Sequence, residues 1–295
     1  MSTALRTGSR RAALALLLAV PLAAQPAPTP RVIAIGGVVT EIIHALGAAD
    51  RIVGVDASST RPAAATAHPR VGSARSTTAE ALLALRPTTI LATSPGDRQP
   101  ALTTARGAGV RVVALPDALT LDAVGERMRT IGQAVGTEAA GRVLAARVVG
   151  DVRAASARQR ARGAAPRVLF VYARGTGTLF AAGRDTEMHL LLDLAGLRNA
   201  FESVEGFKPI TAEAVAASGA DVLIFTESGL ESVGGARGAL AAIPGLALTP
   251  AGRAGRLVTF PDDGLLWMGP RLAESVTTVG DGVRRALTAS ASTAR

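Results

Sequence analysis

Residues 78–93 read TAEALLALRPTTILAT and residues 211–226 read TAEAVAASGADVLIFT, and the likeness of these two stretches decides the fold. Each begins with Thr-Ala-Glu-Ala, continues with mostly apolar residues, passes a Pro or a Gly, and ends in an apolar run. A Thr before an Ala-rich segment is typical of a helix N-cap, and a short apolar run bounded by turn residues is typical of a buried strand. Both stretches therefore predict a capped helix, a tight connection and a buried strand.

Three further pairs of segments resemble one another in the same order along the chain. They are 31–33 with 167–169, 40–47 with 186–196, and 109–117 with 254–262. Thr40 and Thr186 each precede an apolar segment that ends in Gly, which predicts a capped helix at both places. Four matches in one order predict an internal duplication into two lobes of similar topology. Because strands alternate with helices, we expect α/β lobes with parallel, Rossmann-like sheets.

The segment between the repeats is rich in Ala, Arg, Val and Leu and has no strand pattern. Its apolar residues recur at helical spacing, so we expect two helices, the second long and crossing from lobe to lobe. The predicted organisation has six parts: a signal peptide (1–24), a tether (25–30), an N-terminal α/β lobe (31–118), a helical linker (119–166), a C-terminal α/β lobe (167–285) and a tail (286–295).

The first 24 residues have the pattern of a secretory signal peptide. Arg6, Arg10 and Arg11 form a positive start, residues 12–24 are an apolar run, and small residues at its end offer a cleavage site. The run is shorter than the roughly 20 residues that a transmembrane helix needs. We therefore expect the protein to be exported.

The chain contains no Cys. A lipid anchor on an N-terminal Cys, structural disulfides and thiolate metal sites are excluded for this reason. An exported protein without an anchor suits the periplasm of a double-membraned bacterium, where we expect it to be a monomer.

Composition and motifs argue against nucleic-acid binding and against catalysis. The formal net charge is +9, but the Arg residues are scattered and aromatic residues make up only 3% of the chain, too few for base-stacking platforms. No GxSxG motif and no phosphate-binding GxxxxGK motif occurs, and the three His residues lie far apart in the sequence. We expect no enzyme and no catalytic cofactor, but a ligand site in the cleft between the lobes.

Glu80 and Glu213 occupy the same place in the two repeats. Helix-end chemistry accounts for both, because Thr77-x-x-Glu80 fits a capping box and acids are favoured near a helix N-terminus. A matched pair of carboxylates could equally dock onto a two-fold permease that bears Arg. The residues alone leave both interpretations open.

Six segments together resemble the periplasmic hemin-binding proteins of ABC importers, within the wider group that captures cobalamin and siderophores. They read RVIAIGGVVTEIIHALGAADRIVGVD, VGSARSTTAEALLALRPTTILA, AAGRDT, GFKPITAEAV, IPGLALTPAGRAGRLV and MGPR. The resemblance covers about 31–285 and implies the class III periplasmic binding protein fold, with two lobes joined by a long interlobe helix. It also implies that Glu80 and Glu213 dock onto the permease dimer, and that Arg75 lies near the heme propionates, where an Arg pairs well with a carboxylate.

One position departs from this family pattern. Where the family carries an axial Tyr in a G-Y-x-R pattern, this chain has Gly72-Ser73-Ala74-Arg75. A Ser hydroxyl lacks the acidity and the reach of a Tyr phenolate as an iron ligand. Tyr172, the only Tyr of the chain, and Met268 are the candidate replacements; the alternative is that both are ordinary packing residues.

We therefore expect a periplasmic component of an ABC importer that captures heme between its lobes and delivers it to the permease, in the service of iron uptake. The residues expected to contact the ligand combine Arg for its acidic groups with polar, aromatic and Met side chains, and are Ser73, Arg75, Tyr172, Arg184, Phe207, Trp267, Met268 and Arg271. The alternatives are a siderophore, a corrinoid or another iron chelate as the ligand, a two-lobed chelatase-type enzyme, and a structural or signalling module with the same fold.

Overall fold

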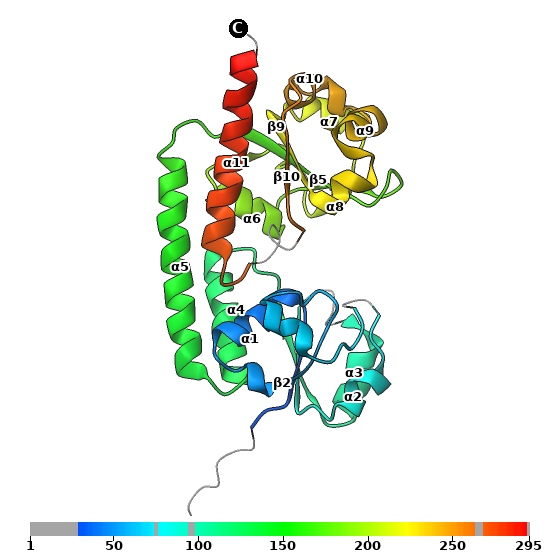
Figure 1. Ribbon diagram of the computed structural model, residues 1–295, viewed down its shortest axis with the longest axis vertical. Coiled ribbons are helices and arrows are strands. Elements are labelled where there is room, and N and C mark those ends of the chain that lie inside the picture. Colours follow the sequence, from blue (N-terminus) through cyan, green and yellow to red (C-terminus); the bar gives the residue numbers. More distant parts are fainter. Residues whose placement is uncertain (1–28, 74–75, 94–97, 263–267, 294–295) are drawn as a thin grey trace, which may run out of the picture.

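The computed structural model describes residues 29–73, 76–93, 98–262 and 268–293, and it forms two α/β lobes beside a pair of long helices (Figure 1). The predicted signal peptide and the predicted ligand contacts Arg75 and Trp267 lie outside these residues. Among the described residues, no helix combines the length and the apolar character that a membrane span requires.

The N-terminal lobe is built on a four-stranded parallel sheet with the order β2-β1-β3-β4. Its elements are β1 (Val32–Ile35), α1 (Gly37–Ala45), β2 (Ile52–Val55), α2 (Ala79–Ala84), β3 (Thr89–Thr93), α3 (Pro100–Gly107) and β4 (Arg111–Leu115), with short 3-10 helices at Ala49–Arg51 and Ala63–Ala67.

The C-terminal lobe repeats this topology and adds to it. Its elements are β5 (Arg167–Ala173), β6 (Leu179–Ala182), α6 (Glu187–Leu194), β7 (Arg198–Asn199), β8 (Phe207–Pro209), α7 (Ala212–Ala217), β9 (Val222–Thr226), α8 (Glu227–Ser232), α9 (Gly235–Ala242), a 3-10 helix (Leu246–Leu248), α10 (Pro250–Arg253), β10 (Leu257–Phe260) and α11 (Leu272–Thr293). Its parallel strands lie in the order β7-β5-β9-β10. This order corresponds strand by strand to β2-β1-β3-β4 of the first lobe. Strands β6 and β8 extend the sheet from the second half of β5 by antiparallel pairing. The predicted fold of two similar Rossmann-like lobes is thus confirmed.

The two stretches that revealed the duplication become matching units, α2 with β3 and α7 with β9. The side chain of Thr78 accepts a hydrogen bond from the Ala81 amide at 3.1 Å, and that of Thr211 accepts one from the Ala214 amide at 3.2 Å. Both helices therefore begin with the same N-cap. The cap of α2 is Thr78 and not Thr77, whose hydroxyl instead donates to the Val71 carbonyl.

Helix α1 begins earlier than predicted, so Thr40 is not an N-cap. The chain turns at Gly36, with a φ of 113°, where a Cβ would lie 2.5 Å from Thr93 Oγ1. Only Gly allows this turn, and it starts the helix directly after β1. Thr40 is consequently inside the helix and fully buried, with its Oγ1 2.7 Å from Ser59 Oγ.

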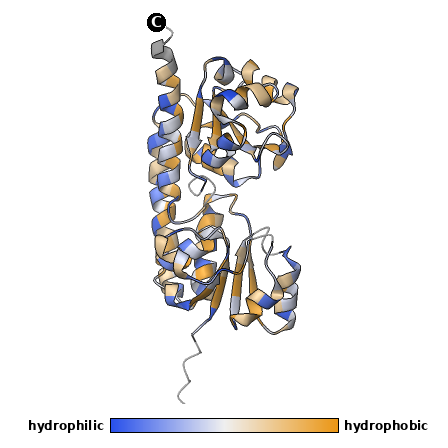
Figure 2. Cartoon of the chain, turned by 45° about the vertical axis from the view of Figure 1, so that its right-hand side comes forward, coloured by the Kyte–Doolittle hydropathy of each residue, from blue (hydrophilic) through white to orange (hydrophobic). Residues whose placement is uncertain are grey.

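The segment between the lobes forms α4 (Leu121–Ala134) and α5 (Glu138–Arg160), as predicted. Gly132 and Gly141 let these two helices approach closely, because a Cβ on Gly132 would lie 2.8 Å from the Gly141 Cα. Figure 1 shows α5 running along both lobes, with α11 beside it. The apolar face of α5 joins the largest hydrophobic cluster of the protein, which also takes in side chains of both lobes. In Figure 2 the strands of both sheets are mostly hydrophobic, whereas hydrophilic residues are spread along the outer faces of the helices.

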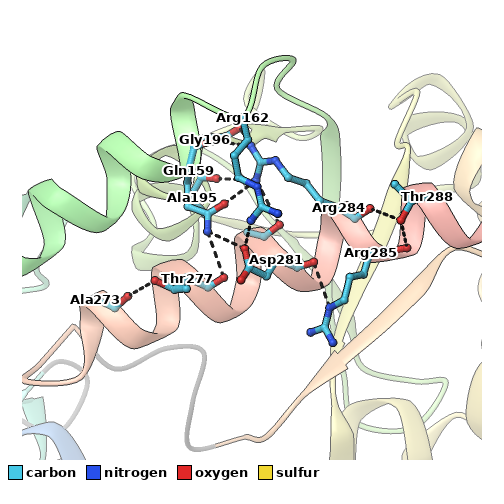
Figure 3. Close-up of polar contacts among 11 residues, drawn as sticks. Gln159, Arg162, Ala195, Gly196, Ala273, Thr277, Asp281, Arg284, Arg285 and Thr288 are labelled. Atoms are coloured by element: carbon cyan, nitrogen blue, oxygen red, sulfur yellow. Dashed lines mark hydrogen bonds and ion pairs between the residues drawn. The ribbon is translucent and has the colours of Figure 1, made fainter.

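A polar network ties the carboxyl-terminal ends of α5 and α6 to α11 (Figure 3). The Arg284 guanidinium donates to the Gln159 carbonyl and to Gln159 Oε1, each at 2.9 Å, and to the Ala195 carbonyl at 3.4 Å. Gln159 Nε2 donates to Asp281 Oδ1 at 2.9 Å, and Arg162 pairs with the same carboxylate. An Arg satisfies helix carbonyls that have no partner within their own helix. The network therefore holds the interlobe helix against α11.

Candidate ligand site between the lobes

A cavity of about 210 Å³ lies between the lobes. The segment that joins β4 to α4 contributes Asp117 and Leu119. The C-terminal lobe contributes residues from the start of α6 and from the turn into β8, namely Asp185, Thr186, Glu187, Met188, Gly206 and Phe207. The cavity thus follows the carboxyl end of β4, which is where ligands bind in open parallel sheets.

Aromatic side chains stand next to this cavity on the C-terminal lobe. Tyr172 is half-buried on β5, and its ring lies 6.5 Å from that of Phe207, edge to face at 72°. Phe180 is paired with Tyr172 across β5 and β6. Phe207 is 43% exposed, which is unusual for a large apolar ring. Tyr172, Phe180 and Phe207 together form an aromatic wall, which includes the phenol group of Tyr172.

Arg174 holds the phenol of Tyr172. Its Nε donates a hydrogen bond to Tyr172 Oη, and its guanidinium carbon lies 5.6 Å from the centre of the Tyr172 ring. The hydrogen bond to Tyr172 raises the pKa of Arg174, which keeps a positive charge beside the phenol oxygen. Sequence reasoning missed Arg174, although Tyr172-Ala173-Arg174 has the Y-x-R spacing of the family pattern that is absent at Ser73.

A buried ion pair forms one side of the cavity. Arg127 of α4 is 4% exposed, and its Nη2 donates to Glu187 Oε1 and to the Pro116 carbonyl, each at 2.9 Å. Its Nη1 donates to the Met268 carbonyl at 3.4 Å, while the Ala118 amide donates to Glu187 Oε1 at 3.2 Å. Burial raises the pKa of Glu187, and the pairing with Arg127 opposes that shift. The pair therefore joins the end of the first lobe to α4, to α6 and to the segment before α11.

Two of the predicted contact residues are engaged elsewhere. The Met268 side chain is 0% exposed and packs in the largest hydrophobic cluster, and its role as an iron ligand stays a prediction. Arg271 Nε donates to Glu41 Oε1 at 2.7 Å, and this ion pair joins the segment before α11 to α1. Arg184, by contrast, is exposed in the turn that precedes α6.

A second, larger cavity of about 550 Å³ lies where α1 meets the segment before α11, and Glu41, His44, Arg61 and Arg271 are among its lining residues. The His44 ring stands 5.5 Å from that of His68, edge to face. Burial lowers the pKa of both His residues; the charge of His68 adds to the effect at His44, and Arg70 adds to it at His68. The described residues contain no cluster of three or more potential metal ligands.

The profile of the periplasmic binding proteins matches residues 32–263. The chain belongs to this family. Among solved structures, it is similar to the periplasmic heme-binding protein RhuT from Roseiflexus sp. RS-1, with 38% identity, a TM-score of 0.82, and coverage of 88% of this chain and 99% of that chain. It is also similar to the periplasmic heme-binding protein BhuT in complex with two hemes, with 38% identity, a TM-score of 0.80, and coverage of 88% and 99%.

A curated relative is the uncharacterized ABC transporter substrate-binding lipoprotein YvrC from Bacillus subtilis (strain 168). It is 25% identical over 193 residues, which are 64% of this chain and 60% of the relative, so the match spans less than two thirds of that protein's length. The fold of the chain is that of the class III periplasmic binding proteins.

In this binding protein, Glu80 and Glu213 are each the second residue of a six-residue helix, α2 and α7, and both are exposed. The duplication thus places one carboxylate at equivalent points of the two lobes. Ser73 lies in the N-terminal lobe with its Oγ 2.7 Å from Ser76 Oγ, so its hydroxyl has a neighbouring hydroxyl as a partner.

Proposed function

We propose that this periplasmic binding protein captures heme between its lobes and delivers it to the permease of an ABC importer. The observation that carries the proposal is the phenol of Tyr172, held by Arg174 beside the aromatic wall at the interlobe cavity. The similarity to heme-binding proteins of known structure supports heme over a siderophore, a corrinoid or another iron chelate.

Tyr172 is the iron ligand in this proposal. A phenolate is an established axial ligand of heme iron, and it carries a negative charge when it binds. The Nε–H of Arg174 points at the phenol oxygen, so a cation is already in place to stabilise that charge. The Y-x-R unit of the family pattern has, in this proposal, moved from the N-terminal lobe to β5.

The acidic groups of heme need cationic partners. Arg184 is exposed in the turn before α6 and is the candidate that the structure describes, while Arg75 and Trp267 stay predictions outside the described residues. Because Arg271 is paired with Glu41, we assign it to holding α11 against α1. In this proposal Phe207 makes an apolar contact with the heme ring, and Ser73 makes a polar contact with the heme from the N-terminal lobe.

Delivery requires a partner in the membrane. We assign docking to Glu80 and Glu213, because they are exposed and occupy equivalent positions on the two lobes. Two equivalent carboxylates suit a dimeric permease that presents Arg twice. The protein is, in this proposal, an exported periplasmic monomer without catalytic activity. Its signal peptide (1–24) and its lobe boundaries remain those predicted from the sequence.

Titration of the processed protein with hemin, followed by absorbance, tests the proposal. We expect a shifted Soret band that Tyr172→Phe abolishes, with a loss of affinity of at least about tenfold, because phenylalanine has no oxygen to bind iron. Tyr172→Phe keeps the aromatic ring beside Phe207, so the variant removes the oxygen without removing the ring contact. Cobalamin and ferric siderophores are titrated in parallel. Tight binding of one of these without a spectral response to hemin would overturn the assignment of heme.

A further inference from the structure

Four large hydrophobic side chains of the described residues are exposed, namely Leu119, Val143, Phe207 and Leu248. Two of them, Leu119 and Phe207, line the same cavity between the lobes although 88 positions separate them in the sequence. Leu119 comes from the segment that leaves the N-terminal lobe, and Phe207 comes from β8 of the C-terminal lobe. Apolar groups that meet from two lobes and stay open to solvent mark a surface for an apolar ligand group.

The same cavity is acidic at its rim. Asp117 and Asp185 are exposed and line it, and neither has an ion-pair partner among the residues that the structure describes. The third acid, Glu187, is neutralised by Arg127 at 2.9 Å. Two carboxylates with no counter-charge repel another carboxylate that enters the cavity.

From these two features we infer that the cavity between Leu119 and Phe207 receives the vinyl-bearing edge of the tetrapyrrole and excludes its propionate edge. The inference rests on the proposed function and deepens it, because it sets how the ligand is oriented. Heme carries two carboxylates along one edge and apolar vinyl and methyl groups along the other. An apolar cavity with an acidic rim accepts the second edge and rejects the first.

The position of the cavity agrees with ligation by Tyr172. The ring of Phe207 lies 6.5 Å from the ring of Tyr172, which is well within the span of a porphyrin. A macrocycle bound through the Tyr172 oxygen therefore extends over Phe207 and reaches the cavity. The propionates then stay outside the cavity. Arg184 is exposed in the turn before α6 and is not among the described residues that line the cavity, so it is available to the propionates there.

The test compares hemin with deuterohemin, in which hydrogen atoms replace both vinyl groups. We expect the protein to bind hemin more tightly by about tenfold, the size that a few buried carbon atoms produce in an apolar pocket. Leu119→Ala, alone and combined with Phe207→Ala, should reduce this ratio toward one. The single variant matters because Leu119 lies in the segment between β4 and α4, outside the C-terminal lobe that carries Tyr172, so its replacement leaves the aromatic wall around Tyr172 intact.

Val143→Ala and Leu248→Ala are the matched controls, because they remove the other two exposed hydrophobic side chains and should leave the ratio unchanged. Equal affinity of the unmodified protein for hemin and deuterohemin, or a ratio that survives Leu119→Ala with Phe207→Ala, would overturn the inference. Failure of the proposed function looks different, since no Soret shift would then appear with either porphyrin.

A second experiment, proton NMR of the heme methyl groups, tests the role of the acidic rim. In the low-spin or high-spin ferric complex, each orientation of the heme gives a separate set of heme-methyl proton resonances. A heme that is turned over keeps its propionate edge outside and can give a second set in either protein, so the readout is an additional set. We expect Asp117→Asn with Asp185→Asn to show such a set, at about one tenth of the total or more, that the unmodified protein lacks, because about tenfold discrimination by charge is lost. Asn tolerates the left-handed backbone of Asp185, whose φ is 56°, so the variant should fold. The same sets of resonances in both proteins would contradict a role of these carboxylates.

Discussion

At the scale of single residues, the site depends on side chains that hold one another. Arg174 directs a cation at the phenol of Tyr172, and Phe207 packs edge to face against the same ring. The guanidinium of the neighbouring Arg127 donates hydrogen bonds to three separate segments of the chain. The side chains of the proposed ligand site are therefore already restrained in the ligand-free protein.

Arg174→Gln should weaken heme binding by about 10- to 100-fold, which is the usual effect of removing a residue that supports a metal ligand. The physical reason is that the phenolate loses its cationic hydrogen-bond donor. Absorbance titration with hemin measures the change, and Arg237→Gln on the exposed face of α9 is the matched control. An Arg174→Gln variant with unchanged spectrum and affinity would show that Tyr172 does not depend on this donor.

His44 and His68 make stability depend on pH. Burial lowers the pKa of each below the ordinary 6.5, so the folded state binds fewer protons than the unfolded state between the lowered values and 6.5. Stability from these groups is complete above pH 6.5 and is lost as the pH falls through the lowered pKa values. We expect the urea midpoint to fall with decreasing pH in this window, and His44→Gln with His68→Gln to flatten the slope. His189→Gln, on the other lobe, is the control; an unflattened slope in the double variant would contradict the assignment.

At the scale of secondary-structure elements, α11 connects the interlobe helix α5 with α6 of the C-terminal lobe. It packs along α5, and Arg284 connects the two helices through the carbonyls at the end of α5 and α6 (Figure 3). Gly280 allows the contact, because a Cβ there would lie 2.4 Å from Gln159 Oε1. The last helix of the chain thus fixes the orientation of the helix that joins the lobes.

Arg284→Ala should lower the free energy of unfolding by about 2 kcal/mol, because charged donors to helix carbonyls are removed and the carbonyls stay partly buried. Urea denaturation measures the loss. Arg285→Ala is the matched control, since Arg285 is exposed and makes only a 3.4 Å contact with the Asp281 carbonyl. Equal effects of the two substitutions would mean that the network contributes little.

At the scale of the whole molecule, the two lobes are held by helices and not by strands that cross between them. Helices α4, α5 and α11 lie along one side of the lobes. The Arg127–Glu187 pair joins α4 to α6 of the C-terminal lobe, next to the cavity between the lobes. Because the pair is buried, its disruption would leave an uncompensated charge inside the protein. The packed helices and the buried ion pair therefore restrain how the two lobes sit against each other.

Glu80→Ala with Glu213→Ala should abolish heme uptake by the intact importer and leave the hemin titration of the isolated protein unchanged. Each substitution removes an exposed carboxylate for docking and touches no group of the ligand site. Growth on heme as the iron source measures uptake, and Glu126→Ala with Glu138→Ala supplies a control with two other exposed acids. Loss of hemin binding in the docking variant would contradict the assigned role.

The sequence by itself determined the architecture of this protein: two duplicated α/β lobes, the caps Thr78, Thr186 and Thr211, and two helices between the lobes. These features follow from local pattern, because capping and hydrophobic periodicity act over a few residues. The sequence also singled out Tyr172 as a candidate iron ligand, because it is the only Tyr of the chain and Ser73 stands where the family carries a Tyr; this assignment stays a prediction.

Only the tertiary structure decided which side chains meet at the cleft. It buried Met268, paired Arg271 with Glu41, and brought Leu119 to the same cavity as Phe207. These contacts join residues far apart in the chain, so they depend on how the helices set the two lobes against each other. A local sequence pattern does not specify how the lobes are arranged. That arrangement decides which side chains are buried and which charges form pairs.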